Sequence, residues 1–149
     1  MALGVPDTGY YEAQRRSVNE QYGVESANNA YTRFLSQQRG ERDLAGMQRN
    51  YQRSFPGFRA GQAQRGMSGG GISSGVINQA MSRYMGDYTR SYGQAQNDLT
   101  ESLRQFDFNQ SRLTAGRDNA LAEIDLEKAR EIAFAAQNIE QLRSMLGGL

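Results

Sequence analysis

Apolar residues recur at intervals of three and four along the C-terminal half of the chain. The spacing is clearest between residues 77 and 106, where no step departs from it. Steps of this kind place side chains on one face of an α-helix. The members of this apolar stripe are Ile77, Met81, Tyr84, Tyr88, Tyr92, Ala95, Leu99, Leu103 and Phe106. The pattern predicts one long amphipathic helix over residues 74–146.

The stripe also repeats every 11 residues. The members of the main series are Ile77, Tyr88, Leu99, Gln110, Leu121 and Ile132. An 11-residue repeat corresponds to about 3.67 residues per turn, which favours a nearly straight or slightly right-handed bundle over a left-handed heptad coil. The N-terminal half repeats the pattern more weakly, at Tyr11, Tyr22, Leu44 and Phe55, with Arg33 interrupting the series. We therefore expect a first helical segment over residues 8–55.

Turn-forming residues separate the two predicted helices. The sequence predicts a connector over residues 56–73, with its turn at Gly69, Gly70 and Gly71. Pro56 is expected to end the first helix, because the residue before a proline avoids the helical region.

Other helix ends and breaks are predicted from single residues. Asp7 or Thr8 is a suitable N-cap for the first helix, and Ser73 or Ser74 for the second. Gly147 lies where a C-terminal cap glycine belongs. Residues 1–7 and 147–149 are expected to be terminal tails. Within the first segment, helix breaks are expected near three interior glycines, which disfavour helix: Gly23, Gly40 and Gly46.

The predicted fold is all-α, a hairpin of two long helices joined by a glycine-rich turn. Such a hairpin has one seam and no enclosed core, so its remaining apolar side chains need other partners. Because helices gain most of their stability from packing, we expect several copies to assemble into an oligomeric helical bundle or ring. The predicted interface residues are Ile77, Met81, Tyr84, Tyr88, Tyr92, Leu99, Leu103, Phe106, Leu121 and Ile132.

The composition removes most catalytic chemistry. The chain has no His and no Cys, so it lacks the usual zinc ligands, thiol nucleophiles and the commonest general base. The acidic residues between Asp118 and Glu131 do not match the spacing of a calcium loop. We expect no catalytic, cofactor-binding or metal site, no cofactor and no small-molecule substrate, and hence a protein that is not an enzyme.

Two features of the sequence are candidates for a phosphate or nucleic-acid site. The segment Arg65–Gly75 lacks the spacing of either glycine-rich nucleotide-binding motif, so an interhelical turn is favoured. The rings of Tyr84, Tyr88 and Tyr92 could stack on bases, but the stripe continues as ordinary apolar residues, which favours a packing seam.

Charge along the chain is uneven although the net charge is +1. Residues 39–65 contain six arginines against Glu41 and Asp43. This excess fits contact with DNA, an acidic partner or a membrane surface. Pairing with a neighbouring subunit is the favoured interpretation.

The chain contains no apolar run of transmembrane length. Its first residues lack the basic start and apolar core of a signal peptide, so export by the general pathway is not expected.

The glutamine-rich, proline-poor helical segments around Arg65-Gly66-Met67-Ser68-Gly69-Gly70-Gly71, followed by the aromatic run Tyr84–Tyr92, resemble small helical virion proteins of tailed bacteriophages. These include internal ejection-type proteins and head-to-tail or tail components. The resemblance spans roughly Tyr11 to Leu146 and is one of pattern, without a diagnostic motif. It implies a structural virion protein, made in the host cytoplasm, that forms a symmetric multi-copy assembly around or inside the DNA exit path. Its partners would be further copies and other virion proteins, with DNA or membrane contact during ejection.

Two other classes share these features. One is a bacterial secreted helical-hairpin protein that builds a needle or pairs with a partner hairpin, although the Trp-x-Gly turn of one such family is missing. The other is a helical scaffolding or nucleic-acid-coating protein, which the near-neutral net charge disfavours.

Overall fold

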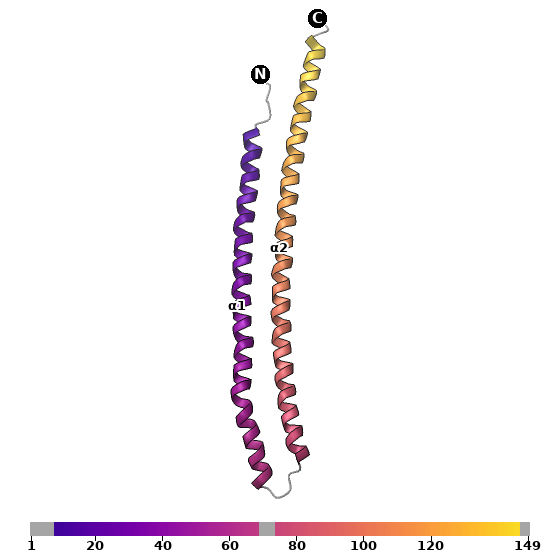
Figure 1. Cartoon of the computed structure of the whole chain (residues 1–149). Helices are drawn as coiled ribbons and strands as arrows, with labels where there is room; N and C mark the ends of the chain where they lie inside the picture. Colours follow the sequence, from indigo (N-terminus) through magenta and orange to yellow (C-terminus); the bar gives the residue numbers. More distant parts are fainter. Residues whose placement is uncertain (1–7, 69–73, 147–149) are drawn as a thin grey trace. The chain divides into compact units, whose positions relative to one another are not determined.

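The computed structural model describes residues 8–68 and 74–146, and both segments are helical. Helix α1 is Thr8–Ser68 and helix α2 is Ser74–Leu146. Figure 1 shows each helix as a continuous ribbon over its range. The all-helical character is confirmed, and α2 has the predicted bounds. The predicted turn at Gly69, Gly70 and Gly71 and the caps at Asp7, Ser73 and Gly147 lie outside the described residues.

The prediction that α1 ends at Phe55 is wrong, because α1 passes through Pro56 and continues to Ser68. A proline inside a helix removes one backbone hydrogen bond and crowds the preceding turn. Packing on both sides of Pro56 opposes this cost. The rings of Phe55 and Phe58 both stack on Tyr84 of α2, with centroid separations of 6.1 and 4.5 Å. Much of the predicted 56–73 connector is therefore helix.

The expected breaks at glycines of α1 are also absent, since the helix runs through Gly23, Gly40 and Gly46. A glycine in a helix interior costs roughly 1 kcal/mol relative to alanine. That cost is small beside the packing of a long helix along a partner, so it weakens α1 without interrupting it.

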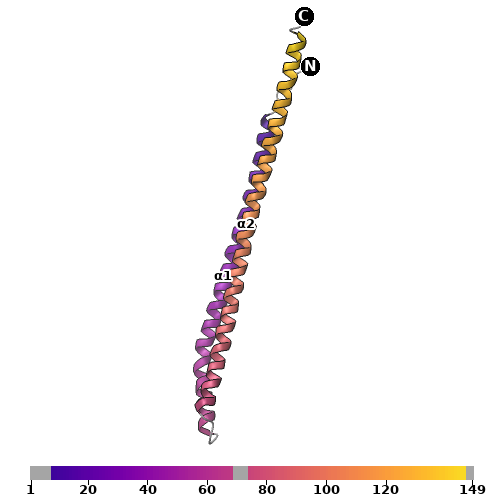
Figure 2. The same cartoon turned by 90° about the vertical axis from the view of Figure 1, so that its right-hand side faces the viewer.

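The chain divides into two compact units. Unit 1 combines Met1–Ala30 with Asp107–Leu149, and unit 2 is Tyr31–Phe106. In each unit a segment of α1 lies beside a segment of α2, as the views in Figures 1 and 2 agree. The pairing is antiparallel in both. In unit 1, Arg15 contacts Asp125 and Tyr22 contacts Thr114. In unit 2, Tyr51 contacts Tyr88 and Ser54 contacts Tyr84.

In each unit, the two helix segments pack against each other along one seam. Among the described residues, only Tyr11 and Ile124 are buried hydrophobic residues, with 2% and 8% of their surfaces exposed. The other seam residues are half-buried. On α1 the half-buried positions include Tyr22, Arg33, Leu44 and Phe55. Arg33 thus lies on the seam although it interrupts the apolar series. The 11-residue repeat of seam positions on α1 therefore continues through residue 33.

Candidate functional site

The structure places nine of the ten predicted interface residues on the α2 seam. These nine are half-buried: Ile77, Met81, Tyr84, Tyr88, Tyr92, Leu99, Leu103, Phe106 and Leu121. The tenth, Ile132, has 48% of its surface exposed. Within each unit the seam residues therefore pack along the helix pair of one chain, while the end of the stripe is open to other partners.

Aromatic rings dominate one part of unit 2. Tyr51 of α1 stacks on Tyr88 of α2 with centroids 4.1 Å apart and planes 18° apart. Tyr84 stacks between Tyr51 and Phe58, at 5.7 and 4.5 Å. The Tyr84 hydroxyl also hydrogen-bonds the Ser54 hydroxyl. Aromatic pairs add roughly 0.5–1.5 kcal/mol beyond the burial of their area. The rings of Tyr84 and Tyr88 pack on rings of α1 in the same unit, as expected for a packing seam.

Close helix approach marks another part of unit 2. A Cβ atom added at Gly40 would lie 2.5 Å from Leu99 Cδ1 and 3.0 Å from Leu99 Cγ. Such distances are far shorter than ordinary carbon–carbon contact, so a larger residue at 40 would push Leu99 away. At Gly23, Gly46, Gly57 and Gly61 of α1, an added Cβ would have nothing within 4 Å. Gly40 thus marks a point where α1 lies close to the Leu99 side chain, and a larger residue there requires the end of that side chain to move.

Unit 1 has a hydrogen-bonded polar layer where unit 2 has rings. Gln110 Nε2 donates to the Tyr22 hydroxyl at 3.2 Å and to Ser26 Oγ at 2.8 Å. Gln110 Oε1 accepts from Asn29 Nδ2 at 3.1 Å. The Tyr22 hydroxyl also hydrogen-bonds Thr114 Oγ1 at 3.2 Å. All these groups are part-buried, so each hydrogen bond replaces a contact with water.

Arg117 extends the polar layer. Its guanidinium carbon lies 4.6 Å from the centre of the Tyr22 ring, within cation–π range. Its Nε and Nη2 donate to Asp118 Oδ1 at 2.9 and 2.7 Å, which raises the pKa of Arg117. The hydrogen bond with Thr114 is the main cause that lowers the pKa of Tyr22, against the opposing effect of desolvation. This layer was not predicted, although the glutamine within the apolar series at position 110 is its signal in the sequence.

The first turns of α1 lie against the acidic part of α2. Tyr11, the most buried side chain described, donates a hydrogen bond to Glu131. Burial, and then that hydrogen bond, raise the pKa of Tyr11 to about 12. Arg15 forms an ion pair with Asp125. At least some of the acidic residues of α2 thus pair with α1, and no group of three or more residues within 8–68 and 74–146 is arranged to hold a metal ion.

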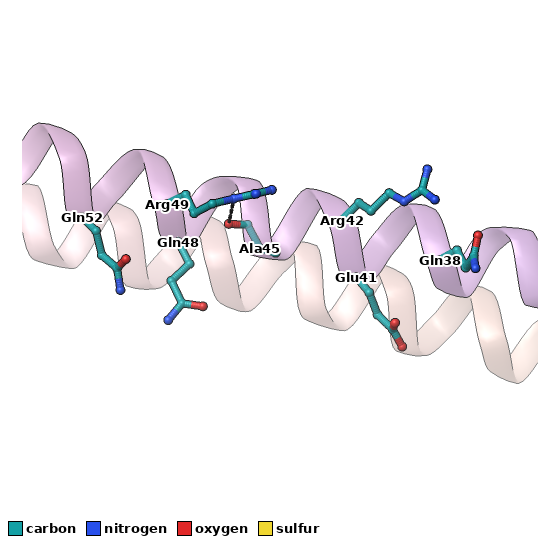
Figure 3. Close-up of a pocket in the computed structure, with 7 residues that line it drawn as sticks. All are labelled: Gln38, Glu41, Arg42, Ala45, Gln48, Arg49 and Gln52. Atoms are coloured by element: carbon teal, nitrogen blue, oxygen red, sulfur yellow. Dashed lines mark hydrogen bonds between the residues drawn. The ribbon is translucent and has the colours of Figure 1, made fainter.

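The hollows in the surface are open grooves along the helices. One is lined along α1 in unit 2 by Gln38, Glu41, Arg42, Ala45, Gln48, Arg49 and Gln52. Figure 3 shows Arg42 and Arg49 projecting from the same side of α1, with Glu41, Gln48 and Gln52 projecting from another side. The Arg49 Nε donates to the backbone oxygen of Ala45 at 3.3 Å.

The last four turns of α2 carry an exposed apolar stripe. Tyr11, in the first turn of α1, reaches α2 at Glu131, and α2 continues to Leu146. The C-terminal stripe consists of Ile132, Ala135, Ile139, Leu142 and Leu146. Its four large members are exposed over 48%, 44%, 44% and 72% of their surfaces, in chain order. Its members are spaced by threes and fours with a repeat of seven, the repeat of a coiled-coil seam.

Neither described helix contains a stretch apolar enough to span a lipid bilayer. Comparison of the chain with protein-family models, with curated proteins and with solved structures finds no match.

Proposed function

We propose that this protein is a non-enzymatic structural component of a tailed-phage virion that packs as a multi-copy helical assembly. The observation that carries the assembly is the exposed C-terminal stripe of α2, whose seven-residue repeat is the pattern by which helices pair. The assignment to a phage particle is based on the sequence pattern, which combines glutamine-rich, proline-poor helices with a glycine-rich segment and an aromatic run. The place of the protein in the particle would be the head-to-tail connection, the tail or the internal ejection machinery.

The energy available from the C-terminal stripe favours more than one neighbour. Complete burial of a large apolar side chain contributes roughly 1.5–3 kcal/mol. The four of one stripe are about half exposed, so burying what remains contributes about 3–6 kcal/mol per stripe and about 6–12 kcal/mol for the two stripes of a pair. Association itself costs roughly 4–15 kcal/mol, and a single pair of stripes is therefore marginal. Phe134 and Met145, each 66% exposed, lie on a second side of the same segment. Two apolar sides on one helix fit a ring or bundle, in which each copy has two neighbours.

The test of assembly is the mass of the full chain in solution, measured by light scattering after size-exclusion chromatography. We expect a discrete oligomer for the natural sequence and smaller species for Ile139→Asp combined with Leu142→Asp. The matched control is Gln137→Asp with Ser144→Asp, which adds the same charge away from both apolar sides and should leave the mass unchanged. Because all four side chains are exposed, helix content by circular dichroism should stay the same in both variants.

A monomeric natural protein would reject the assembly, and an oligomer that persists in the Ile139 and Leu142 variant would remove the C-terminal stripe as its interface. The virion assignment has its own test, which is mass spectrometry of purified particles of the phage that encodes the chain. Peptides of this protein should be present at many copies per particle. Their absence, or a gene lying among secretion ATPases rather than portal and tail genes, would favour the secreted helical-hairpin class.

A further inference from the structure

Unit 2 carries a row of arginines on the outer side of α1. At about 100° per residue, Arg42, Arg49 and Arg53 lie within about 40° of one another around the helix, and Arg39 lies within about another 40°. We call these four residues the arginine row, and all four are exposed. Gly40, which contacts Leu99, lies roughly 160° away from Arg42 around the helix axis. The arginine row therefore faces away from α2 of its own unit.

The arginine row lacks the carboxylate partners that arginines of α2 have. In α2 of unit 2, Arg90 lies 3.9 Å from Asp87 and Arg104 lies 3.9 Å from Glu101. Arg42, Arg49 and Arg53 have no carboxylate three or four positions away in either direction.

The acidic residues nearest to the arginine row do not neutralise it. Asp43 lies four positions after Arg39, and no ion pair joins any of the four arginines to a carboxylate among the described residues. Glu41 accepts a hydrogen bond from Gln37 at 2.8 Å. Four guanidinium groups on one exposed face thus remain as an uncompensated positive surface.

The net charge of +1 conceals a separation of charge between the units. Unit 2 contains ten arginines against five carboxylates, a net charge of +5, and unit 1 contains seven basic against eleven acidic residues, a net charge of −4. Electrostatic attraction of a polyanion depends on the local field rather than on the total charge. A near-neutral total is therefore compatible with a strongly basic face in unit 2.

A second copy of the chain offers no matching row of carboxylates on the outer side of α2 in unit 1. The described residues within about 40° of the position opposite the seam are Phe108, Arg112, Ala115, Asn119, Ala122, Leu126, Arg130, Ala133, Gln137, Glu140 and Ser144, of which Glu140 alone is acidic. The partner that fits the arginine row has its own regular series of anions over about 21 Å, the rise of α1 from Arg39 to Arg53. Guanidinium groups bind phosphate through two parallel hydrogen bonds. We infer that the arginine row binds the sugar–phosphate backbone of a nucleic acid, without sequence preference.

This binding is separate from the assembly proposed above, because the arginine row belongs to unit 2 and the C-terminal stripe to unit 1. Phosphate contacts from guanidinium groups position a protein on nucleic acid and carry no sequence information, which is the reason for the absence of sequence preference. Each phosphate that an arginine neutralises releases counterions, and affinity must then fall steeply with salt. Salt dependence is thus the specific signature of the arginine row.

The experiment is fluorescence anisotropy of the full chain with labelled duplex and single-stranded DNA about 20 nucleotides long, between about 50 and 200 mM salt. The test variant is Arg42→Gln/Arg49→Gln/Arg53→Gln. The matched control is Arg83→Gln/Arg90→Gln/Arg104→Gln, which removes the same charge from α2 of the same unit. We expect the test variant to bind at least about tenfold more weakly at low salt. Its log–log salt slope should fall by roughly 0.9 for each lost duplex contact.

The control should keep most of the affinity and the slope. Equal losses in the two variants would show that net charge alone drives binding and would overturn the arginine row as a site. The same follows if the natural protein fails to bind DNA at low salt, or binds polyglutamate or anionic lipid vesicles as tightly as DNA. Circular dichroism and light scattering on both variants should match the natural protein, so that failure of binding is distinct from failure of assembly.

Discussion

The seams of the two units follow the same 11-residue repeat but consist of different kinds of side chain. In unit 2, stacked rings and a glycine bring α1 and α2 together, as in the 4.1 Å separation of Tyr51 and Tyr88. In unit 1, the corresponding positions form a hydrogen-bonded layer around Gln110 and Tyr22. An 11-residue repeat fixes which positions of each helix lie on the seam, but the chemistry at those positions decides what the contact requires. Ring contacts need shape, and the polar layer needs every donor and acceptor to be matched.

The largest effect should come from placing a charge in the ring seam of unit 2. Tyr88→Asp removes the stack on Tyr51 and introduces a carboxylate among aromatic rings, at a cost of about 3 kcal/mol or more. The free energy of unfolding, measured with hydrogen exchange that reports unit 2 separately, should fall accordingly. Leu99→Asp should lower the free energy of unfolding of unit 2 in the same way. The exposed control Gln94→Asp should change stability little, and a Tyr88 variant as stable as the natural protein would contradict the seam.

A smaller effect is expected from removing the centre of the polar layer in unit 1. Gln110→Ala removes the hydrogen bonds of Gln110 with Tyr22, Ser26 and Asn29, which costs about 1–2 kcal/mol because these groups are part-buried. The exposed Gln137→Ala in the same unit should stay within about 0.5 kcal/mol of the natural protein. Urea titration of both variants measures the difference. Equal stability of the two would mean that water replaces the layer and that the two seams differ less than their contacts indicate.

Two glycines of unit 2 sharpen the contrast further. Gly46→Ala has open space for the new methyl group and should stabilise α1 by roughly 0.5–1 kcal/mol through helix propensity. Gly40→Ala gains the same propensity but displaces Leu99, so it should be destabilising by about 1 kcal/mol. Adding Leu99→Ala to Gly40→Ala should remove the clash, giving a coupling energy in a double-mutant cycle. If Gly40→Ala stabilised as much as Gly46→Ala, the close approach would not exist.

The smallest effect concerns alkaline pH in unit 1. The pKa of Tyr11 is about 12 in the folded chain against 10.0 without the fold. The unfolded chain therefore loses the Tyr11 proton first, and the contribution of Tyr11 to stability is present below pH 10 and lost as pH rises toward 12. The contribution of Tyr22 to stability changes with pH in the opposite direction, because the pKa of Tyr22 is lowered in the folded chain. Thermal unfolding between pH 8 and about 11 should show a shallower decline for Tyr11→Phe than for the natural protein. Parallel declines would contradict the buried, hydrogen-bonded Tyr11.

Much of the seam could be predicted from the spacing of apolar residues, because helix geometry maps that spacing directly onto one face. Tyr84, Leu99 and Phe106 follow in this way. The polar layer could not be predicted, since Gln110 is informative only when the residues opposite to it are known. Those residues depend on the register between α1 and α2, which periodicity leaves open.

The continuation of α1 past Pro56 also depends on a contact that the local sequence does not reveal. The local preference of the residue before a proline is to leave the helix, and this preference is visible in the sequence. The stacking of Phe58 on Tyr84, which opposes it, involves two residues far apart in the chain. The arginine row was visible as an excess of charge, but its position opposite to the seam required the helix phase and the contacts of Gly40.

The contact between Gly40 and Leu99 has a consequence for alignment. A seam that repeats every 11 residues looks nearly the same after one helix slides by one repeat, so a periodic stripe alone permits several alignments. Such a slide in unit 2 would move Leu99 from Gly40 to the level of Tyr51, where no gap exists for it. The absence of a side chain at Gly40 therefore favours the native alignment of α1 and α2 over one shifted by a repeat. A larger residue at position 40 would remove this preference and let shifted alignments compete with the native one.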